Sequence, residues 1–292
     1  MTSVLITGCS SGIGLETALA FARRGDRVHA CVRDPATAGE LLGRARAENL
    51  TLDVPRLDVT TDDASVAAAV DGVLRRHGAI DVLVNNAGID RTGTVETMPQ
   101  DEARAVLETN LWGPLRTVRA VLPSMRARGS GVVVNVSSLA GRTFAVPHGG
   151  FYAASKAALG TLSEALSAEV RPFGIRVVCL EPGSFASRIN RDSPVAAAPS
   201  EVSAADPYTA DRAWTARFLA RVQQGAGDCG EVAEAVLAAA DDPGTPLHVP
   251  VGKDAETALE YLGSTSYEQW LPLFLQQAQS LVGPRPGGAG SE

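Results

Sequence analysis

Short apolar runs alternate with longer amphipathic segments from the N-terminus to about residue 251, and this alternation constrains the fold more than any other feature. Short β-branched runs between turn residues are typical of buried strands, whereas a 3.6-residue apolar period predicts helices. Such alternation predicts a doubly wound α/β domain, in which helices cover both faces of a parallel sheet. Seven strands are expected, at residues 4–7, 26–32, 51–57, 80–84, 132–136, 175–180 and 246–251.

Eight helices are expected around this sheet. The fourth contains Gly113 and Pro114, so a kink is expected there. With 292 residues, of which 45% are apolar, the chain can bury one large core, and we expect a single domain over residues 1–282. The predicted helices are residues 13–24, 35–48, 62–77, 100–128, 151–172, 213–223, 231–240 and 267–280.

The regular alternation stops after the sixth predicted strand. Pro194, Pro199 and Pro207 lie among alanines and serines in an irregular stretch. A long irregular segment inside a compact domain is typical of a functional loop, so we expect a substrate lid over about residues 183–224. A helical extension is expected over about 254–282. The final GPRPGGAGSE, residues 283–292, is typical of a disordered tail.

Charge and cysteine content exclude several classes of protein. The 33 acidic and 26 basic residues give a net charge of −7, and no basic run is long enough to follow a phosphate backbone, so a nucleic acid partner is not expected. The four cysteines are far apart, with no CxxC pair, and are expected to be reduced thiols. No signal peptide or long apolar span is recognisable, which favours a soluble, cytoplasmic protein without membrane attachment.

The positions of the histidines and of Ser138 argue against two further kinds of site. His29, His77, His148 and His248 form no ligand spacing with cysteines or carboxylates, so no metal is predicted. Ser138 lies in no G-x-S-x-G sequence, which disfavours a serine hydrolase.

A glycine-rich turn follows the first predicted strand. Its sequence, TGCSSGIG at residues 7–14, leads directly into a predicted helix. Glycines allow positive φ and a close approach of the backbone to a ligand, and a helix N-terminus offers free N–H groups to a phosphate. The turn therefore predicts a dinucleotide site, although its G-x-x-x-G-x-G spacing differs from the common G-x-G-x-x-G.

Tyr152 and Lys156 form the strongest chemical pattern. The chain contains only one other lysine, Lys253, and uses arginine for nearly all its other basic positions. Residues at i and i+4 share one helix face, so the phenol and the ammonium can reach one small volume. A compact cation there favours the phenolate, a role for which a guanidinium is poorly suited.

Together these patterns resemble the short-chain dehydrogenase/reductase family. The resemblance covers about residues 3–252 and rests on TGxxxGIG, on Asn-Asn-Ala-Gly at 85–88, on Asn110, Ser138 and the YxxxK pair, and on Pro-Gly at 182–183. The stretches CSSGIG, VRD, GSGVVVNVSS and PFGIRV are most similar to the hydroxysteroid and retinol dehydrogenase branch. The resemblance implies a Rossmann-like domain and homodimers or homotetramers.

The resemblance also implies a catalytic set of Asn110, Ser138, Tyr152 and Lys156. Tyr152 would be the general acid or base, with its pKa lowered by about 3 units by the charges of Lys156 and an oxidised nicotinamide ring. Ser138 would hold the substrate oxygen, and Lys156 would also bond the nicotinamide ribose. Asn110 would bond a backbone carbonyl and a water that leads to Lys156.

Residues after the second strand bear on the cofactor. Enzymes selective for NAD commonly place a carboxylate there, whereas this chain has Arg33, which can bind a 2′-phosphate with Ser10. NADP(H) is therefore favoured, with NAD(H) left open because Asp34 follows. The cofactor contacts implied by the resemblance are Gly8, Ser10, Ser11, Gly12, Ile13, Gly14, Arg33, Asp58, Val59, Asn86, Ala87, Gly88, Tyr152, Lys156, Pro182, Gly183 and Ser187.

Aromatic residues near the expected pocket or lid suggest a hydrophobic substrate. The predicted substrate contacts are Ser138, Phe144, His148, Tyr152 and Phe185. We expect an NADP(H)-dependent oxidoreductase that interconverts a hydrophobic ketone or aldehyde and an alcohol. Two alternatives stay open: a redox-neutral enzyme of the same fold, such as a cyclase, dehydratase or epimerase, and a non-enzymatic dinucleotide sensor.

Overall fold

The computed structural model describes residues 1–187, 189 and 206–286. The predicted lid prolines Pro194 and Pro199, and most of the predicted tail, lie outside the described residues. No helix in the described ranges is long and apolar enough to cross a membrane.

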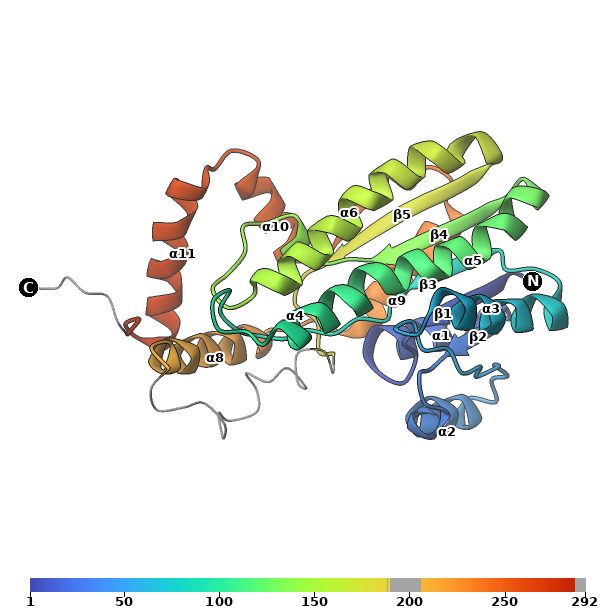
Figure 1. The fold of residues 1–292 in the computed structure, drawn as a ribbon, viewed down its shortest axis with the longest axis horizontal. Helices are drawn as coiled ribbons and strands as arrows, with labels where there is room; N and C mark the ends of the chain where they lie inside the picture. The colour runs from blue at the N-terminus through green and yellow to red at the C-terminus, as the bar shows by residue number, and fades with distance from the viewer. Residues whose placement is uncertain (188, 190–205, 287–292) are drawn as a thin grey trace, which may run out of the picture.

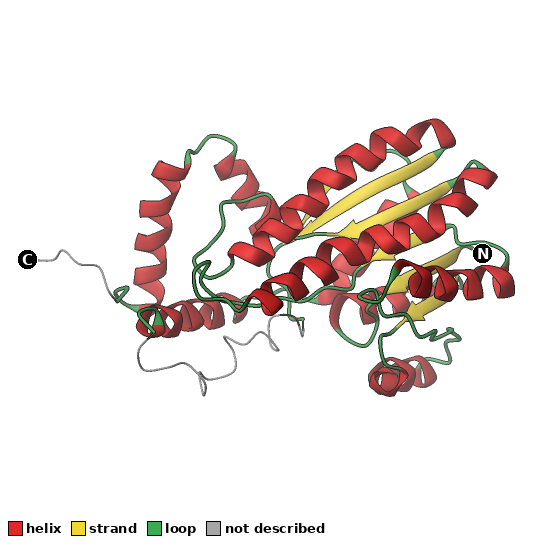
Figure 2. Cartoon of the chain, in the orientation of Figure 1, coloured by secondary structure: helices red, strands yellow, loops and turns green. Residues whose placement is uncertain are grey.

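One parallel sheet forms the centre of the molecule, with its strands in the order β2-β1-β3-β4-β5-β6 (Figures 1 and 2). The chain passes from β1 outward to β2 and then returns to the other side of β1 at β3. This reversal places the carboxyl ends of β1 and β3 next to each other, which is where open α/β sheets bind ligands. The strands are β1 Ser3–Thr7, β2 Arg27–Cys31, β3 Val82–Asn85, β4 Gly131–Val136, β5 Ile175–Pro182 and β6 His248–Val251.

The α/β prediction is confirmed, but the sheet has six strands and not seven. The segment predicted as a strand at 51–57 runs beside β2 and forms only isolated bridges, at Asp53 and Arg56. Asp53 O accepts from Ala30 N at 2.8 Å, and Leu57 N donates to Val32 O at 2.9 Å. Pro55 lies between these bonds and has no N–H to donate, which interrupts the ladder.

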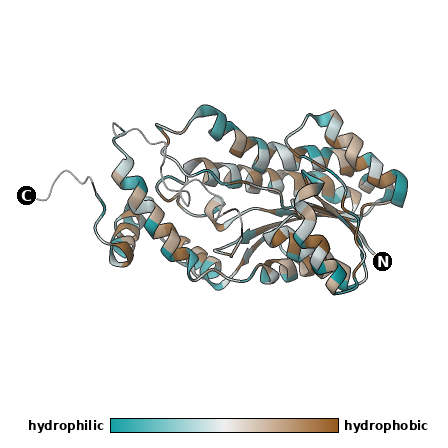
Figure 3. Cartoon of the chain, turned by 90° about the horizontal axis from the view of Figure 1, so that it is seen from below, coloured by the Kyte–Doolittle hydropathy of each residue, from teal (hydrophilic) through white to brown (hydrophobic). Residues whose placement is uncertain are grey.

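Both faces of the sheet are buried. On one face, Val4 and Ile6 of β1 pack with α1 Gly12–Arg23, α2 Gly39–Ala47 and α9 Cys229–Asp241. On the other face, Leu5 packs with α3 Asp63–His77, α5 Gly113–Arg128 and α6 Gly150–Val170. Hydrophobic strands accordingly lie between two layers of helices (Figure 3). Neighbouring strand residues face opposite layers, which explains why the strands are continuous apolar runs.

The long segment predicted as one kinked helix at 100–128 contains three parts. Helix α4 Gln100–Leu107 passes into a π-helical turn, Glu108–Trp112, and then into α5. The Gly113 N–H bonds Glu108 O, and Pro114 has no N–H to offer the Asn110 carbonyl four residues earlier. A wider turn therefore precedes the expected kink position, and it carries Asn110.

The C-terminal part extends beyond the sheet. The helices α8 Thr209–Gln223, α10 Lys253–Leu262 and α11 Tyr267–Val282 follow β5 and β6. Helices α8 and α11 meet at the end of the molecule farthest from the N-terminus (Figure 1). Four short helical turns complete the described structure: Pro35–Ala38, the π turn already given, Leu139–Gly141 and Arg171–Phe173.

Candidate active site

The glycine-rich turn lies at the crevice between the carboxyl ends of β1 and β3. The Asn86 amide donates to Thr7 O at 2.9 Å and to Gly8 O at 3.2 Å. Thr7 Oγ1 accepts from the N–H groups of Asn86 and Ala87 at 3.1 and 3.0 Å. Gly8 has φ +74°, and a Cβ there would lie 2.8 Å from the Ala87 Cα. The loop after β3 therefore fixes the shape of the turn, with Gly88 beside it.

The start of α1 fits a phosphate group. Ser11 is the residue before the helix, and its side chain forms no capping bond. The first turn of the helix, which begins with Gly12 and Ile13, contains no acidic residue. Its N–H groups, next to Ser10 and Ser11, are thus available to an anion at the positive end of the helix dipole. A pyrophosphate suits this donor set.

The residues after β2 suit a 2′-phosphate. Arg33 is exposed and forms no ion pair with any residue that the structure describes. The Asp34 carboxylate accepts from Ala36 N at 3.0 Å and thereby caps the turn that precedes α2. Since Asp34 is used in this cap, Arg33 is the strand-end side chain free to reach a ligand.

The remaining predicted cofactor residues lie along the same edge. Asp58 accepts from Thr60 N at 3.0 Å, and Val59 is buried. Pro182 ends β5, and Gly183 N donates to Val251 O at 2.9 Å. Ser187 N bonds Phe185 O at 2.8 Å.

Tyr152 and Lys156 lie near the beginning of helix α6 and on the same face of it, as predicted. The Lys156 Nζ lies 5.8 Å from the centre of the Tyr152 ring and donates to Val136 O at 2.9 Å. Ser138 lies close enough to Tyr152 to lower the pKa of the phenol. It is the second residue after the end of β4, and its Oγ accepts from Ala140 N at 3.2 Å. A phenol, a hydroxyl and an ammonium thus meet at the carboxyl end of the sheet.

Asn110 is fully buried in the π-helical turn, and hydrogen bonds of its side-chain amide hold it in place. Its Oδ1 accepts from Ile89 N at 2.8 Å, and its Nδ2 donates to Ile89 O at 2.9 Å and to Ser155 Oγ at 3.0 Å. The predicted bond to a backbone carbonyl is therefore present. A Cβ on Gly88 would lie 3.3 Å from Asn110 Oδ1 and 3.6 Å from Lys156 Nζ, so the glycine leaves these polar groups close together.

The protein groups around Tyr152 raise its pKa above the ordinary value. Burial raises it to about 12, the hydrogen bond with Ser138 opposes the rise, and the nearby charge of Asp90 adds to it. Burial lowers the pKa of Lys156 to about 8, against smaller opposing effects of Cys179 and Asp90. The predicted lowering depends in part on the positive charge of an oxidised nicotinamide ring, and it stays a prediction. The residues of this chain by themselves keep Tyr152 protonated at neutral pH.

Asp90 is a site residue that sequence reasoning missed. Its Oδ1 is buried and has no hydrogen-bond partner among the described residues. Burial raises its pKa to about 6, and the neighbouring Arg91 and Lys156 oppose that rise. A single aspartate after the Asn-Ala-Gly loop gives no sequence signal of its own. Only its position near Tyr152 and Lys156 identifies it.

Phe144 begins a row of aromatic rings that leads from the catalytic loop to the C-terminal helices. Its ring lies 5.5 Å from Tyr267 and 5.4 Å from Trp270. Trp270 stacks on Phe274 at 4.8 Å, and Phe274 meets Phe218 of α8 at 5.4 Å. Trp214, which is fully buried, lies 6.2 Å beyond Phe218. Among these rings, the sequence predicted Phe144 as a substrate contact and did not predict the rings of α11.

His148 and Phe185 occupy structural positions. His148 has φ +65° and is buried, and its Nε2 lies 2.8 Å from Asp211 Oδ2 of α8. Arg285 holds the same carboxylate at 2.6 and 2.8 Å. Phe185 is 3% exposed and packs in the hydrophobic core between Gly227 and Gly252. We therefore leave Phe185 out of the substrate site.

The chain is similar to known proteins in both sequence and structure. The family model for short chain dehydrogenase matches residues 2–196. Human 17-beta-hydroxysteroid dehydrogenase type 1 is 42% identical over 188 residues, which cover 62% of this chain and 56% of that protein. Bovine (Bos taurus) retinol dehydrogenase 8 is 38% identical over 217 residues, which cover 71% and 66%. The chain thus matches less than two thirds of the length of either relative.

Two solved structures extend the match. A short-chain dehydrogenase from Streptomyces avermitilis superposes with a TM-score of 0.75, at 35% identity over 96% of this chain and 97% of that one. A single-residue variant of actinorhodin polyketide ketoreductase, solved with NADPH, superposes with a TM-score of 0.72, at 32% identity over 85% and 95%. The chain belongs to the short-chain dehydrogenase/reductase family of oxidoreductases, in its hydroxysteroid and retinol dehydrogenase branch.

Proposed function

We propose that the protein is an NADP(H)-dependent reductase that converts a hydrophobic ketone or aldehyde into an alcohol, and can run the reverse reaction. One observation carries the proposal: Tyr152, Ser138 and Lys156 meet beside the glycine-rich turn, with Asn110 fixed behind them. When bound, the nicotinamide supplies the hydride, which is the step that protein side chains cannot perform.

The side chains would handle the substrate oxygen and its proton. Ser138 donates a hydrogen bond to the carbonyl oxygen, where negative charge develops during reduction. Tyr152 donates its phenolic proton to that oxygen as the alcohol forms. Lys156 would hold the nicotinamide ribose, and its charge would stabilise the resulting phenolate. Asn110 would position a water that leads from Lys156 toward solvent.

The pKa of Tyr152 supports the reductive direction. A value of about 12 in the protein alone leaves the phenol protonated at neutral pH, which is the form that donates to a carbonyl. Oxidation of an alcohol needs the phenolate first. Bound oxidised cofactor, with its positive ring, would favour that form and so permit the reverse reaction.

Arg33 supports NADP(H) as the cofactor. Its exposed guanidinium is free of ion pairs with the described residues, and Asp34 is engaged as a cap. A planar guanidinium can bind a 2′-phosphate through two parallel hydrogen bonds. Actinorhodin polyketide ketoreductase, a structural neighbour, was solved with NADPH.

The row of aromatic rings supports a hydrophobic substrate. It runs from Phe144, beside the catalytic loop, through Trp270 to Phe218. Aromatic walls bury apolar ligand surface and leave the few polar groups to orient the reacting carbon. A ketone with a long or ring-shaped apolar body fits this lining better than a small polar one.

A panel of hydrophobic ketones and alcohols, followed by nicotinamide absorbance with each cofactor, tests the proposal. Tyr152→Phe should lower ketone-dependent NADPH oxidation by about 100-fold or more, because it removes the proton donor. NADPH binding, measured by titration calorimetry, should be nearly unchanged. Tyr261→Phe is the matched control, since Tyr261 is 46% exposed on α10. Retained turnover in Tyr152→Phe would reject Tyr152 as the acid, and no redox signal with any compound would favour a redox-neutral reaction.

The cofactor preference has its own test. Arg33→Ala should raise the KM for NADPH by about 10- to 100-fold, which corresponds to loss of a charged hydrogen bond to phosphate. The KM for NADH should change little. Arg46→Ala, which removes another exposed arginine on α2, should leave both values alone. Equal effects of Arg33→Ala on both cofactors would contradict the role of Arg33.

A further inference from the structure

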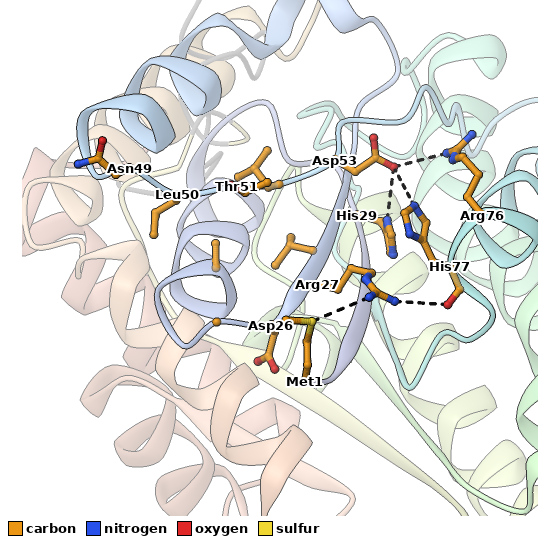
Figure 4. A pocket seen from close by; sticks show the side chains of 14 residues that line it. Met1, Asp26, Arg27, His29, Asn49, Leu50, Thr51, Asp53, Arg76 and His77 are labelled. Atoms are coloured by element: carbon orange, nitrogen blue, oxygen red, sulfur yellow. Dashed lines mark hydrogen bonds and ion pairs between the residues drawn. The ribbon is translucent and has the colours of Figure 1, made fainter.

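Three side chains with metal-ligating atoms meet at the end of the sheet opposite to the catalytic residues. His29 lies in the middle of β2, Asp53 on the segment beside it, and His77 is the last residue of α3 (Figure 4). The sequence predicted no metal site because these residues are 24 positions apart from one to the next. The fold brings one ligand atom of each within 4.8 Å of the others.

The spacing of these atoms is close to that of a metal site. Asp53 Oδ2 lies 3.4 Å from His29 Nδ1 and 3.8 Å from His77 Nε2. Tetrahedral zinc with ligand distances of about 2.0–2.1 Å separates neighbouring ligand atoms by roughly 3.3 Å. Small side-chain rotations would therefore bring the carboxylate and both imidazoles into coordination distance. The carboxylate and His77 are partly exposed, which gives them room to adjust.

The hydrogen bonds of Ser3 orient the His29 ring. Ser3 Oγ has one proton and donates it to Ala79 O at 2.6 Å. His29 Nε2, at 3.3 Å from the same Oγ, is then the donor to it. The other ring nitrogen, Nδ1, points toward Asp53 Oδ2 at 3.4 Å, which is longer than an ordinary N–H···O hydrogen bond.

The bond to Ser3 holds His29 in the way that a metal-bound imidazole is held. Ligating imidazoles almost always donate their other N–H to a neighbouring oxygen, as His29 does to Ser3. Two imidazoles and one carboxylate are a ligand set that suits zinc and similar ions. We propose that His29, Asp53 and His77 form a binding site for a divalent transition metal ion of the zinc class, with solvent completing the coordination.

The surroundings of the site contain a favourable helix dipole and two opposing positive charges, those of Arg76 and Arg27. The C-terminal end of α3, where His77 lies, carries the negative end of the helix dipole and favours a cation. Arg76 Nη2 lies 3.4 Å from Asp53 Oδ2 and competes for the same oxygen. The Arg76 side chain is 56% exposed, so it can turn away into solvent. A cavity of about 680 Å³ beside the cluster gives an ion and its water ligands access.

A second group of ligand types, Cys179, Glu181 and His248, is less suitable. Arg142 holds Glu181 Oε1 at 2.9 Å, and Glu164 holds His248 Nε2 at 3.0 Å. Burial raises the pKa of the Cys179 thiol to about 11, so it keeps its proton. The carboxylate and imidazole of this group are held by charged partners at 3.0 Å or less, whereas Arg76, the charged partner of Asp53 outside the first cluster, lies 3.4 Å away and is exposed.

Titration calorimetry with Zn²⁺ on the chelator-treated full chain tests the proposal. The wild-type chain should bind one ion with saturation. His77→Gln should weaken binding by at least about 100-fold, and Ser3→Ala, which removes the acceptor behind His29, by about 10- to 100-fold. Arg76→Gln should tighten binding severalfold because it removes the competing cation. His248→Gln, at the second group, is the matched control and should bind as the wild type does.

Circular dichroism would confirm that each variant is folded, and His29 itself is left unchanged because it is buried in the sheet. Substitution with Co²⁺ gives a second readout, since the visible absorption of the bound ion should disappear in His77→Gln. The proposal is overturned if the wild type shows no saturable binding. It is overturned equally if His77→Gln binds as tightly as the wild type, or if the loss occurs in His248→Gln.

Discussion

At the scale of single residues, Asp90 differs from the rest of the site because it adds a negative charge where the chemistry needs positive ones. Its buried Oδ1 has no partner among the described residues, and its charge raises the pKa of both Tyr152 and Lys156. Burial is the main cause that keeps the phenol protonated, and the charge of Asp90 adds to it. This charge also stabilises the charged form of Lys156 against the effect of burial.

Asp90 should give the folded protein a defined dependence of stability on pH. Its pKa is about 6 in the folded chain and 3.8 as an ordinary value, so the folded state holds more protons between these values. The free energy of unfolding should therefore fall as pH rises through that window, by at most about 3 kcal/mol. In Asp90→Asn, the free energy of unfolding should no longer fall over this pH range, as measured by urea unfolding at several pH values.

The control for this measurement is Asp71→Asn, because Asp71 is exposed on α3. It should keep the pH dependence of the wild type. If Asp90→Asn and the wild type have parallel stability profiles between about pH 4 and about pH 7, the carboxyl of Asp90 does not titrate in that range.

At the scale of elements, the packing of α1 against the glycine-rich turn determines the phosphate site. A Cβ on Gly14 would overlap the Gly8 carbonyl and the Asn86 amide, which are themselves bonded to each other. The neighbouring atoms belong to backbone and to a fixed side chain, so they cannot move aside cheaply. The helix approaches the turn this closely only because residue 14 is glycine.

Gly14→Ala should therefore lower the free energy of unfolding by about 1–3 kcal/mol through overpacking, and should weaken NADPH binding as the turn shifts. Gly43→Ala is a matched control within α2, where a Cβ would meet nothing within 4 Å. That change should raise the free energy of unfolding by about 0.5–1 kcal/mol. Urea unfolding measures both variants, and equal stability of the two would contradict the packing argument.

At the scale of the whole molecule, Asp211 joins three distant parts of the chain. It lies on α8 and binds His148 from the catalytic loop and Arg285 from the segment after α11. Arg285 in turn lies over the Trp214 ring, and the Trp214 indole donates to Gly283 O at 2.8 Å. The C-terminal segment is thereby fastened to α8 and to the loop that carries His148.

Asp211→Asn should loosen this connection, because an amide cannot balance the charge of Arg285. We expect a rise in the KM for hydrophobic ketones of about tenfold and a loss of about 1–3 kcal/mol in the free energy of unfolding, with the KM for NADPH unchanged. Arg285 and His148 lower the pKa of Asp211. The stability that Asp211 contributes is therefore fully present above the ordinary pKa of a carboxyl group. It is lost as the pH falls through the lower pKa that Asp211 has in the folded protein.

Asp241→Asn serves as the control for Asp211→Asn, since Asp241 is 61% exposed and pairs with Arg24 at the surface. Asp241→Asn should change the free energy of unfolding by no more than about 0.5 kcal/mol. A proportional rise in the KM for NADPH and for ketone in Asp211→Asn would indicate general loosening, and would contradict a role limited to the substrate side.

Most of the fold was predictable because local patterns determine it. Apolar strand runs and the glycines around Gly8 reflect nearby backbone requirements, and the spacing of Tyr152 and Lys156 reflects one helical turn. The strand predicted at 51–57 is interrupted at Pro55, where one absent N–H outweighed the apolar pattern.

The other differences arose from long-range packing. The burial that sets the pKa of Tyr152, the unpaired oxygen of Asp90 and the core position of Phe185 depend on residues far away in sequence. The meeting of His29 with Asp53 and His77 has the same origin. No local pattern carries such information, since it appears only when strands and helices from separate parts of the chain are in contact.

The interrupted segment beside β2 has a consequence for aggregation. An open sheet ends in a strand with unpaired N–H and C=O groups, which can recruit a strand from another molecule. Here the 51–57 segment covers the outer side of β2, bonding it at Asp53 and Leu57. The cover is short, and Pro55 breaks its regularity, so it is a poor template for further pairing. The same proline that removes a strand from the fold thus helps protect the sheet from pairing with other chains.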